Sequence, residues 1–106
     1  MYHWQTTKYA QHKATDDTIK QLDEHIDVFV EIWMGKYGKV KVTRGTQTIE
    51  LRNMSERTAI KLIKDSIVYL QGPFTKTFKP TDSDLANIRD EIVGDLNTLL
   101  YLFTLQ

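Results

Sequence analysis

Histidine and acidic side chains recur at helical spacing in the first third of this chain. Residues 9 to 34 contain no proline or glycine, and at about 100° per residue their polar side chains fall in one row beside the apolar one. This polar row consists of His12, Asp16, Asp23, Asp27 and Glu31, and a His3-Trp4 pair precedes it. Imidazole and carboxylate groups at the edge of a buried surface suit iron or another first-row transition metal, whereas magnesium and calcium prefer oxygen ligands alone. The polar row therefore predicts a metal site.

A purely structural interpretation of these residues also exists. A single histidine near a helix start is more often a surface residue than a ligand, and an acidic row with i, i+4 spacing is usually a solvated face. His25 lies off the polar row and is predicted to be a surface residue. Trp4 is either an anchor or an aromatic neighbour of the site. The combination of residue types favours metal binding over these alternatives.

The helix that carries the polar row is predicted over residues 9–34. Its apolar positions recur at spacings of three and four and comprise Ile19, Leu22, Ile26, Phe29, Val30 and Trp33. Thr6 and Thr7 are predicted to break the chain before this helix, and Gly35 and Gly38 to end it. In residues 39–51 the apolar period changes to two, which indicates a small β-hairpin or an extended connection.

Two further helices are predicted over residues 55–71 and 82–104. Ser55 is a good N-cap for the first, and Thr81 with Asp84 resembles a capping box for the second. The last helix carries a second polar row, which consists of Asp84, Asn87, Glu91 and Asp95. The fold class is therefore all-α, a helical bundle in a single domain over residues 1–106. Its fourth position is filled by the N-terminal stub or by another subunit.

Composition excludes several classes of function. The chain has no cysteine, which removes disulfides and thiolate sites and fits a reducing, cytoplasmic compartment. Fourteen basic residues balance fourteen acidic ones, so nucleic acid is not an expected partner, and no apolar run approaches the ~20 residues of a membrane span. The wide apolar stripes of the first and last helices predict at least a dimer.

The His-Trp pair, the His-x-x-x-Asp of residues 12–16 and the Asp-x-x-x-Glu of residues 27–31 together resemble the ferroxidase signature of the Dps family of mini-ferritins. The sequence around these motifs is also similar to that of uncharacterised ferritin-like proteins of large viruses and phages. The resemblance covers about the first 35 residues and implies a ferritin-like bundle whose first helix is truncated. It implies iron ligands at His3, His12, Asp16, Asp27 and Glu31, with Trp4 beside the site.

In the family that the chain resembles, the site is shared across a two-fold dimer interface. The two histidines and first aspartate of one subunit face the second aspartate and the glutamate of the other. The resemblance thus implies a homodimer or higher homo-oligomer that binds and oxidises Fe(II), with Zn²⁺ as an inert substitute and a link to oxidative stress. The alternative function is a non-catalytic ferritin-like dimerisation or protein-interaction module with a degenerate metal site.

Overall fold

The computed structural model describes residues 2–38 and 55–105, with side chains from residue 8 onward. Its regular elements are the helices α1 (Tyr2–Tyr37), α2 (Glu56–Gln71) and α3 (Ser83–Thr104) and the short 3₁₀-helix η2 (Pro73–Thr77). All regular structure in these ranges is helical, which confirms the all-α fold class. The β-hairpin predicted within 39–51 lies outside the described residues.

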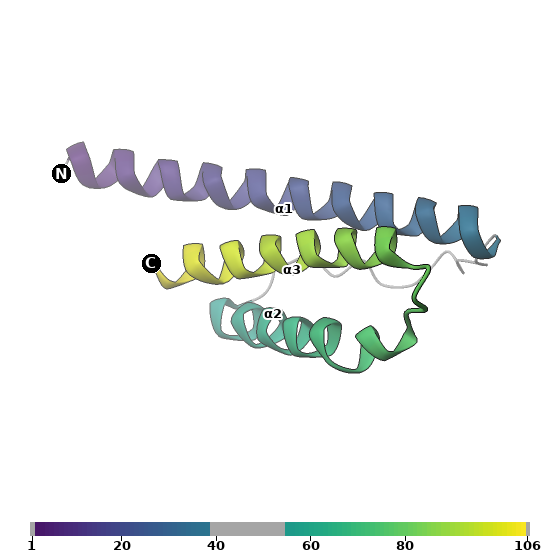
Figure 1. Ribbon diagram of the computed structural model, residues 1–106. Coiled ribbons are helices and arrows are strands. Elements are labelled where there is room, and N and C mark those ends of the chain that lie inside the picture. Colours follow the sequence, from purple (N-terminus) through teal and green to yellow (C-terminus); the bar gives the residue numbers. More distant parts are fainter. Residues whose placement is uncertain (1, 39–54, 106) are drawn as a thin grey trace.

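Helix α1 is one uninterrupted helix of 36 residues, longer at both ends than predicted (Figure 1). The break predicted at Thr6 and Thr7 is wrong, because threonine costs a helix only a fraction of a kcal/mol and lacks the steric block of proline. Elsewhere in α1, the hydroxyl of Thr15 donates to the Gln11 carbonyl at 2.9 Å, in the way threonine is commonly accommodated. Residues 2–8 therefore extend α1 and do not form a fourth helix.

The ends of the helices follow local backbone chemistry. Gly35 is helical, and α1 ends at Tyr37, directly before Gly38, whose φ of 92° lies in the left-handed region that glycine adopts freely. At the start of α2, Ser55 Oγ accepts the Thr58 N–H at 3.3 Å, which confirms the predicted cap. The capping box predicted at Thr81 is wrong, because the N-cap residue of α3 is Asp82 and its carboxylate is used elsewhere.

Helix α3 lies between α1 and α2, and it packs against both (Figure 1). The core cluster contains Leu22 of α1, Ile63 of α2 and three residues of α3, which are Ile92, Leu96 and Leu99. Phe29 of α1 also packs on η2 and on the residue that follows it, with ring centroids 5.7 Å from Phe74 and 6.3 Å from Phe78. Most of the apolar positions predicted from helical spacing therefore lie in or against the core. The prediction is wrong for Ile26, which is 42% exposed.

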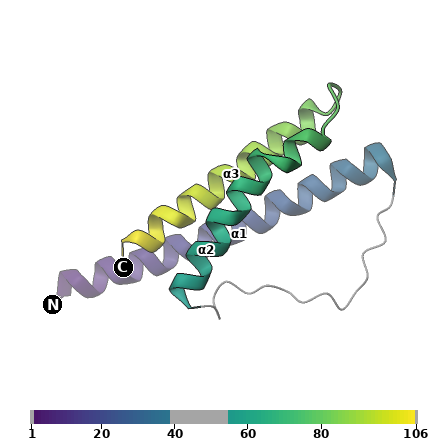
Figure 2. The ribbon, with the colours of Figure 1, turned by 90° about the horizontal axis from the view of Figure 1, so that it is seen from below.

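Helix α1 extends past the end of α3, as both ribbon views show (Figures 1 and 2). Near that end, the Gln11 side chain donates to the Leu105 carbonyl at 3.5 Å. The first turns of α1 thus lie beyond the three-helix core. In the described ranges, none of the helices combines the length and apolar character of a membrane span.

Candidate functional site

The four candidate ligands whose side chains are described all lie on the exposed side of α1. His12, Asp16, Asp27 and Glu31 are each exposed, while Leu22 of the same helix is buried. The expectation that the polar row borders a buried surface is therefore not met within one chain. The geometry leaves the row accessible to solvent and to other molecules.

These candidate ligands form two groups that are far apart along α1. His12 and Asp27 are separated by 15 residues of continuous helix, which corresponds to about 22 Å at 1.5 Å per residue. Among the residues whose side chains are described, no group of three or more His, Asp or Glu residues could hold a metal ion. A site that combines the two groups would therefore have to be completed by a second molecule.

The His3 position is separated from His12 by the same continuous helix. Nine residues correspond to two and a half turns, so the two backbone positions lie about 14 Å apart along the axis and on opposite sides of α1. The side chains of His3 and Trp4 lie outside those described. The straight helix does not bring the His3 position to the side that carries His12.

His25, which lies off the polar row, contacts two acidic side chains of α3. Its Nδ1 lies 2.5 Å from Asp95 Oδ2, and its Nε2 lies 3.1 Å from Glu91 Oε2. Gln21 donates to the other oxygen of Asp95 at 2.9 Å. The prediction that His25 is a surface residue is wrong. Only 22% of its side chain is exposed, and its partner Asp95 is buried. The hydrogen bond to Asp95 raises the pKa of His25, and the negative charges of Asp95, Glu91 and Glu24 add to this effect.

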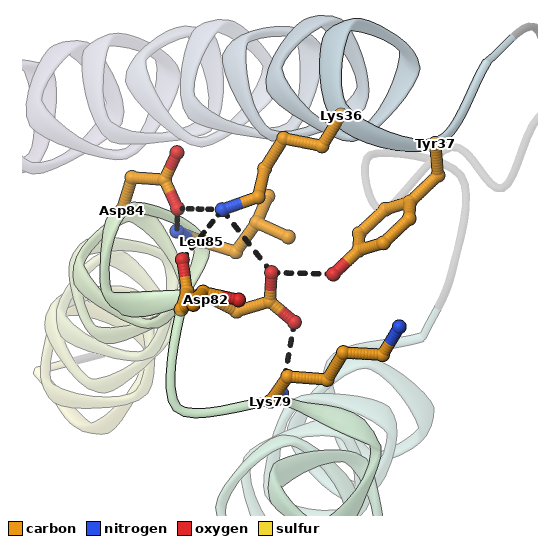
Figure 3. Close-up of polar contacts among 7 residues, drawn as sticks. Lys36, Tyr37, Lys79, Asp82, Asp84 and Leu85 are labelled. Atoms are coloured by element: carbon orange, nitrogen blue, oxygen red, sulfur yellow. Dashed lines mark hydrogen bonds and ion pairs between the residues drawn. The ribbon is translucent and has the colours of Figure 1, made fainter.

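A second polar cluster joins the end of α1 to the start of α3 (Figure 3). Lys36 Nζ lies 2.8 Å from Asp84 Oδ1 and 3.1 Å from Asp82 Oδ1. The Tyr37 hydroxyl donates to Asp82 Oδ1 at 2.5 Å, and the backbone N–H of Lys79 donates to Asp82 Oδ2 at 2.9 Å. Asp82 is almost fully buried, and these hydrogen bonds, that of Tyr37 first, lower its pKa to about 2. The cluster fastens α1 to α3.

The second polar row, on α3, supplies most of the carboxylates in these contacts. Asp84 pairs with Lys36, and Glu91 and Asp95 pair with His25. The i, i+3 and i, i+4 spacing of that row was visible in the sequence. What the sequence did not reveal is that the row faces α1, because this depends on how two helices distant in the chain pack together.

Comparison with known proteins provides a family but no function. No curated protein and no solved structure matches the chain. Residues 3–103 match the model described as "Family of unknown function (DUF5856)". Because the match spans nearly the whole sequence, the chain belongs to the DUF5856 family.

Proposed function

We propose that this protein binds Fe(II) at sites completed between the α1 helices of two copies, and that the iron is oxidised there, as in ferritin-like proteins. The observation that carries the proposal is the exposure of all four described candidate ligands along one side of α1. They contribute nothing to the hydrophobic core, and one chain cannot bring them together. A second copy of the same helix offers the missing half of each site.

The spacing of the polar row fits an antiparallel pair of α1 helices related by a two-fold axis. If His12 faces the partner's Glu31, then Asp16 faces the partner's Asp27 and Lys20 faces the partner's Asp23, because the residue numbers of each pair have the same sum. The two-fold axis repeats every contact, so the pair has two equivalent sites. Lys20 and Asp23 are both exposed, and their opposite charges favour this register at its centre.

In the same register, carboxylates come close together on either side of the centre, and a bound cation would compensate their charges. Asp16 and the partner's Asp27 are like charges, and the partner's Glu31 adds a third carboxylate next to His12. Close carboxylates destabilise one another unless a proton or a cation compensates them. One imidazole with three carboxylates is a mixed nitrogen and oxygen donor set that suits Fe²⁺, Mn²⁺ or Zn²⁺.

Iron is a substrate in this proposal. Each Fe(II) loses one electron, and hydrogen peroxide takes two electrons from two ions and is reduced to two hydroxide ions; dioxygen is the alternative oxidant. His12 must be neutral to coordinate the metal, so binding should weaken as the pH falls. A contribution from His3 would require α1 to bend between His3 and His12.

Anaerobic titration with Fe(II), and with Zn²⁺ as the redox-inert substitute, tests this function. The metal should raise the melting temperature by mass action, and admission of peroxide should produce the absorbance of Fe(III). His12→Ala and Asp16→Asn should abolish most of both responses. Asp17→Asn is the matched control, because Asp17 is also exposed but lies about 100° further around the helix. An absent metal response in the parent protein would refute the proposal.

The second candidate function is a dimerisation or protein-interaction module without oxidation chemistry. The continuity of α1 favours it, because the family that the sequence resembles carries its His-Trp pair on a separate helix. This function predicts that the chain self-associates equally well with Fe(II) and with a chelator. It also predicts that Asp16→Asn strengthens association, because the substitution removes a like-charge contact that no metal compensates.

A further inference from the structure

Tyr9 and Met34 continue the polar row of α1 beyond its two ends. Tyr9 precedes His12 by about one turn, and Met34 follows Glu31 by about one turn. At 3.6 residues per turn, each of the two lies within about 20° of the middle of the row. Tyr9 is 70% exposed and Met34 is partly exposed. The side of α1 that carries the candidate ligands therefore has an apolar residue at either end.

With these two residues and Lys20 included, the row has the same spacing when it is read from either end. Its steps are 3, 4, 4, 3, 4, 4 and 3 residues, over the positions Tyr9, His12, Asp16, Lys20, Asp23, Asp27, Glu31 and Met34. Two copies of such a helix related by a two-fold axis can pair all of these positions at once. The register that brings His12 to the partner's Glu31 also brings Tyr9 to the partner's Met34, because the residue numbers of both pairs have the same sum.

The matched positions of Tyr9 and Met34 distinguish them from ordinary exposed apolar residues. A single exposed apolar side chain needs no partner, because folded proteins expose many apolar atoms. Val28 of the same helix is such a case, since it is 37% exposed but lies more than about 100° from the row. A solvated helix side gives no reason for its two apolar residues to lie at equivalent places about the axis that relates its charged ones.

We propose that Tyr9 packs on the partner's Met34 at the outer end of each metal site and closes that end against water. Each site then lies between the charged pair of Lys20 with the partner's Asp23 on its inner side and an aromatic–thioether pair on its outer side. Tyr9 is about 4.5 Å from His12 along the axis, so its ring covers the edge of the imidazole. Sulfur–aromatic contacts are favourable, and exclusion of water strengthens the attraction between a bound cation and carboxylates.

The role of Tyr9 is to position the two helices and to cover the site, and it is not a metal ligand. The inference rests on the proposed function for the place of the metal. The contact between Tyr9 and the partner's Met34 forms without metal, so it can be tested separately.

Cross-linking of the metal-free protein is the first test, because the chain has no cysteine of its own. Tyr9→Cys and Met34→Cys, refolded together, should be joined by a short bismaleimide into a covalent dimer. This mixed pair keeps one native contact of Tyr9 with Met34. Neither variant alone should be cross-linked, because the antiparallel register places equal positions about 38 Å apart along the axis.

Tyr9→Cys refolded with Val28→Cys is the matched control, and it should give no product, because position 28 lies on another side of α1. A product from Tyr9→Cys alone would mean a parallel pair of helices. That result would overturn the proposal, and so would the absence of a product from Tyr9→Cys with Met34→Cys.

Self-association of the metal-free chain provides the second measurement. Tyr9→Ala should raise the dissociation constant roughly tenfold, because two symmetric sulfur–aromatic contacts are lost. Met34→Ala should have a similar effect, and the double variant should be no weaker than the weaker single one, since both remove the same contact. Tyr101→Ala is the control, because Tyr101 is 61% exposed on α3, and it should leave the constant unchanged. Additive effects of the two substitutions would contradict the contact, and so would an unchanged constant in Tyr9→Ala.

Release of Zn²⁺ to a chelator tests whether Tyr9 closes the site. At a concentration at which both proteins are dimeric, Tyr9→Ala should release the metal severalfold faster than the parent, whereas Tyr9→Phe should behave like the parent because it keeps the ring. An unchanged rate in Tyr9→Ala would contradict the closure. A parent that binds no metal but gives the cross-linked product would refute the iron function and support the contact. A parent that binds metal without giving that product would do the reverse.

Discussion

Two sides of α1 each carry a histidine and acidic residues, but only the side with His25 packs against α3. On the inner side, His25 meets Asp95 and Glu91 of α3, so its polar groups are satisfied within one chain. On the outer side, His12 is exposed, and the acidic residues of its row are exposed as well. Spacing along a helix places side chains on one face. Whether their polar groups find partners depends on which helix packs against that face. The outer side is therefore where an intermolecular contact has room to form.

The largest expected contrast between the two sides is in stability. Leu22→Ala on the inner side should lower the free energy of unfolding by about 2–5 kcal/mol, because Leu22 is buried in the core and truncation leaves a cavity. Asp23→Ala, one residue further on the outer side, should change it by less than about 0.5 kcal/mol in the metal-free protein. Urea denaturation measures both values. Similar losses in the two variants would mean that the outer side is also packed.

The polar cluster around Asp82, which joins the end of α1 to the start of α3, should affect stability in acid. The pKa of Asp82 is about 2 in the folded protein and 3.8 ordinarily, so its stabilisation is complete above pH 3.8 and is lost as the pH falls towards 2. Asp82→Asn should remove this part of the acid sensitivity. It should also lower the melting temperature at neutral pH by roughly 5 °C, because charge-assisted hydrogen bonds are weakened.

Thermal melts of both proteins between pH 2 and 7 provide the measurement. Asp90→Asn is the control, because 69% of the Asp90 side chain is exposed, and it should follow the parent protein. If Asp82→Asn loses stability in acid as steeply as the parent does, the low pKa is not the cause.

The smallest expected effect concerns the centre of the outer side. Lys20→Glu should weaken self-association by roughly tenfold or less, because an exposed attraction becomes a repulsion at two symmetric positions. Combining it with Asp23→Lys exchanges the charges and should restore association. Sedimentation at several concentrations measures the dissociation constants. If the double variant does not regain the self-association of the parent, this register is excluded. That result would not affect the contacts between α1 and α3.

Local patterns in the sequence were sufficient to predict much of the fold. Helices predicted at 55–71 and 82–104 are observed as Glu56–Gln71 and Ser83–Thr104, and the buried Leu22 and Leu99 were among the predicted apolar positions. Strong local signals explain this success, such as the Ser55 cap and the regular apolar spacing. The N-terminal boundary of α1 differs from the prediction, because Thr6 and Thr7 do not interrupt the helix.

The contacts of the inner side could not be predicted in the same way. Asp95 lies 70 residues from His25, and nothing near His25 in the sequence indicates which helix will cover it. The role of Asp82 was missed for a related reason, since its partners include Tyr37 at a separation of 45 residues. The shared metal site remains a prediction, because it depends on contacts between two chains.

Mixing two inactive variants tests the shared site most directly. His12→Ala damages the half-site of its own chain that carries the histidine, and Glu31→Ala damages the other half. A mixed dimer has one site with both defects and one site that is intact, so random mixing should restore Fe(II) binding to about a quarter of the parent level. Anaerobic equilibrium dialysis of each variant alone, and of the two after refolding together, measures this recovery. Recovery on mixing is the predicted result, and its absence, with each variant folded and self-associated, would contradict a site shared between two copies.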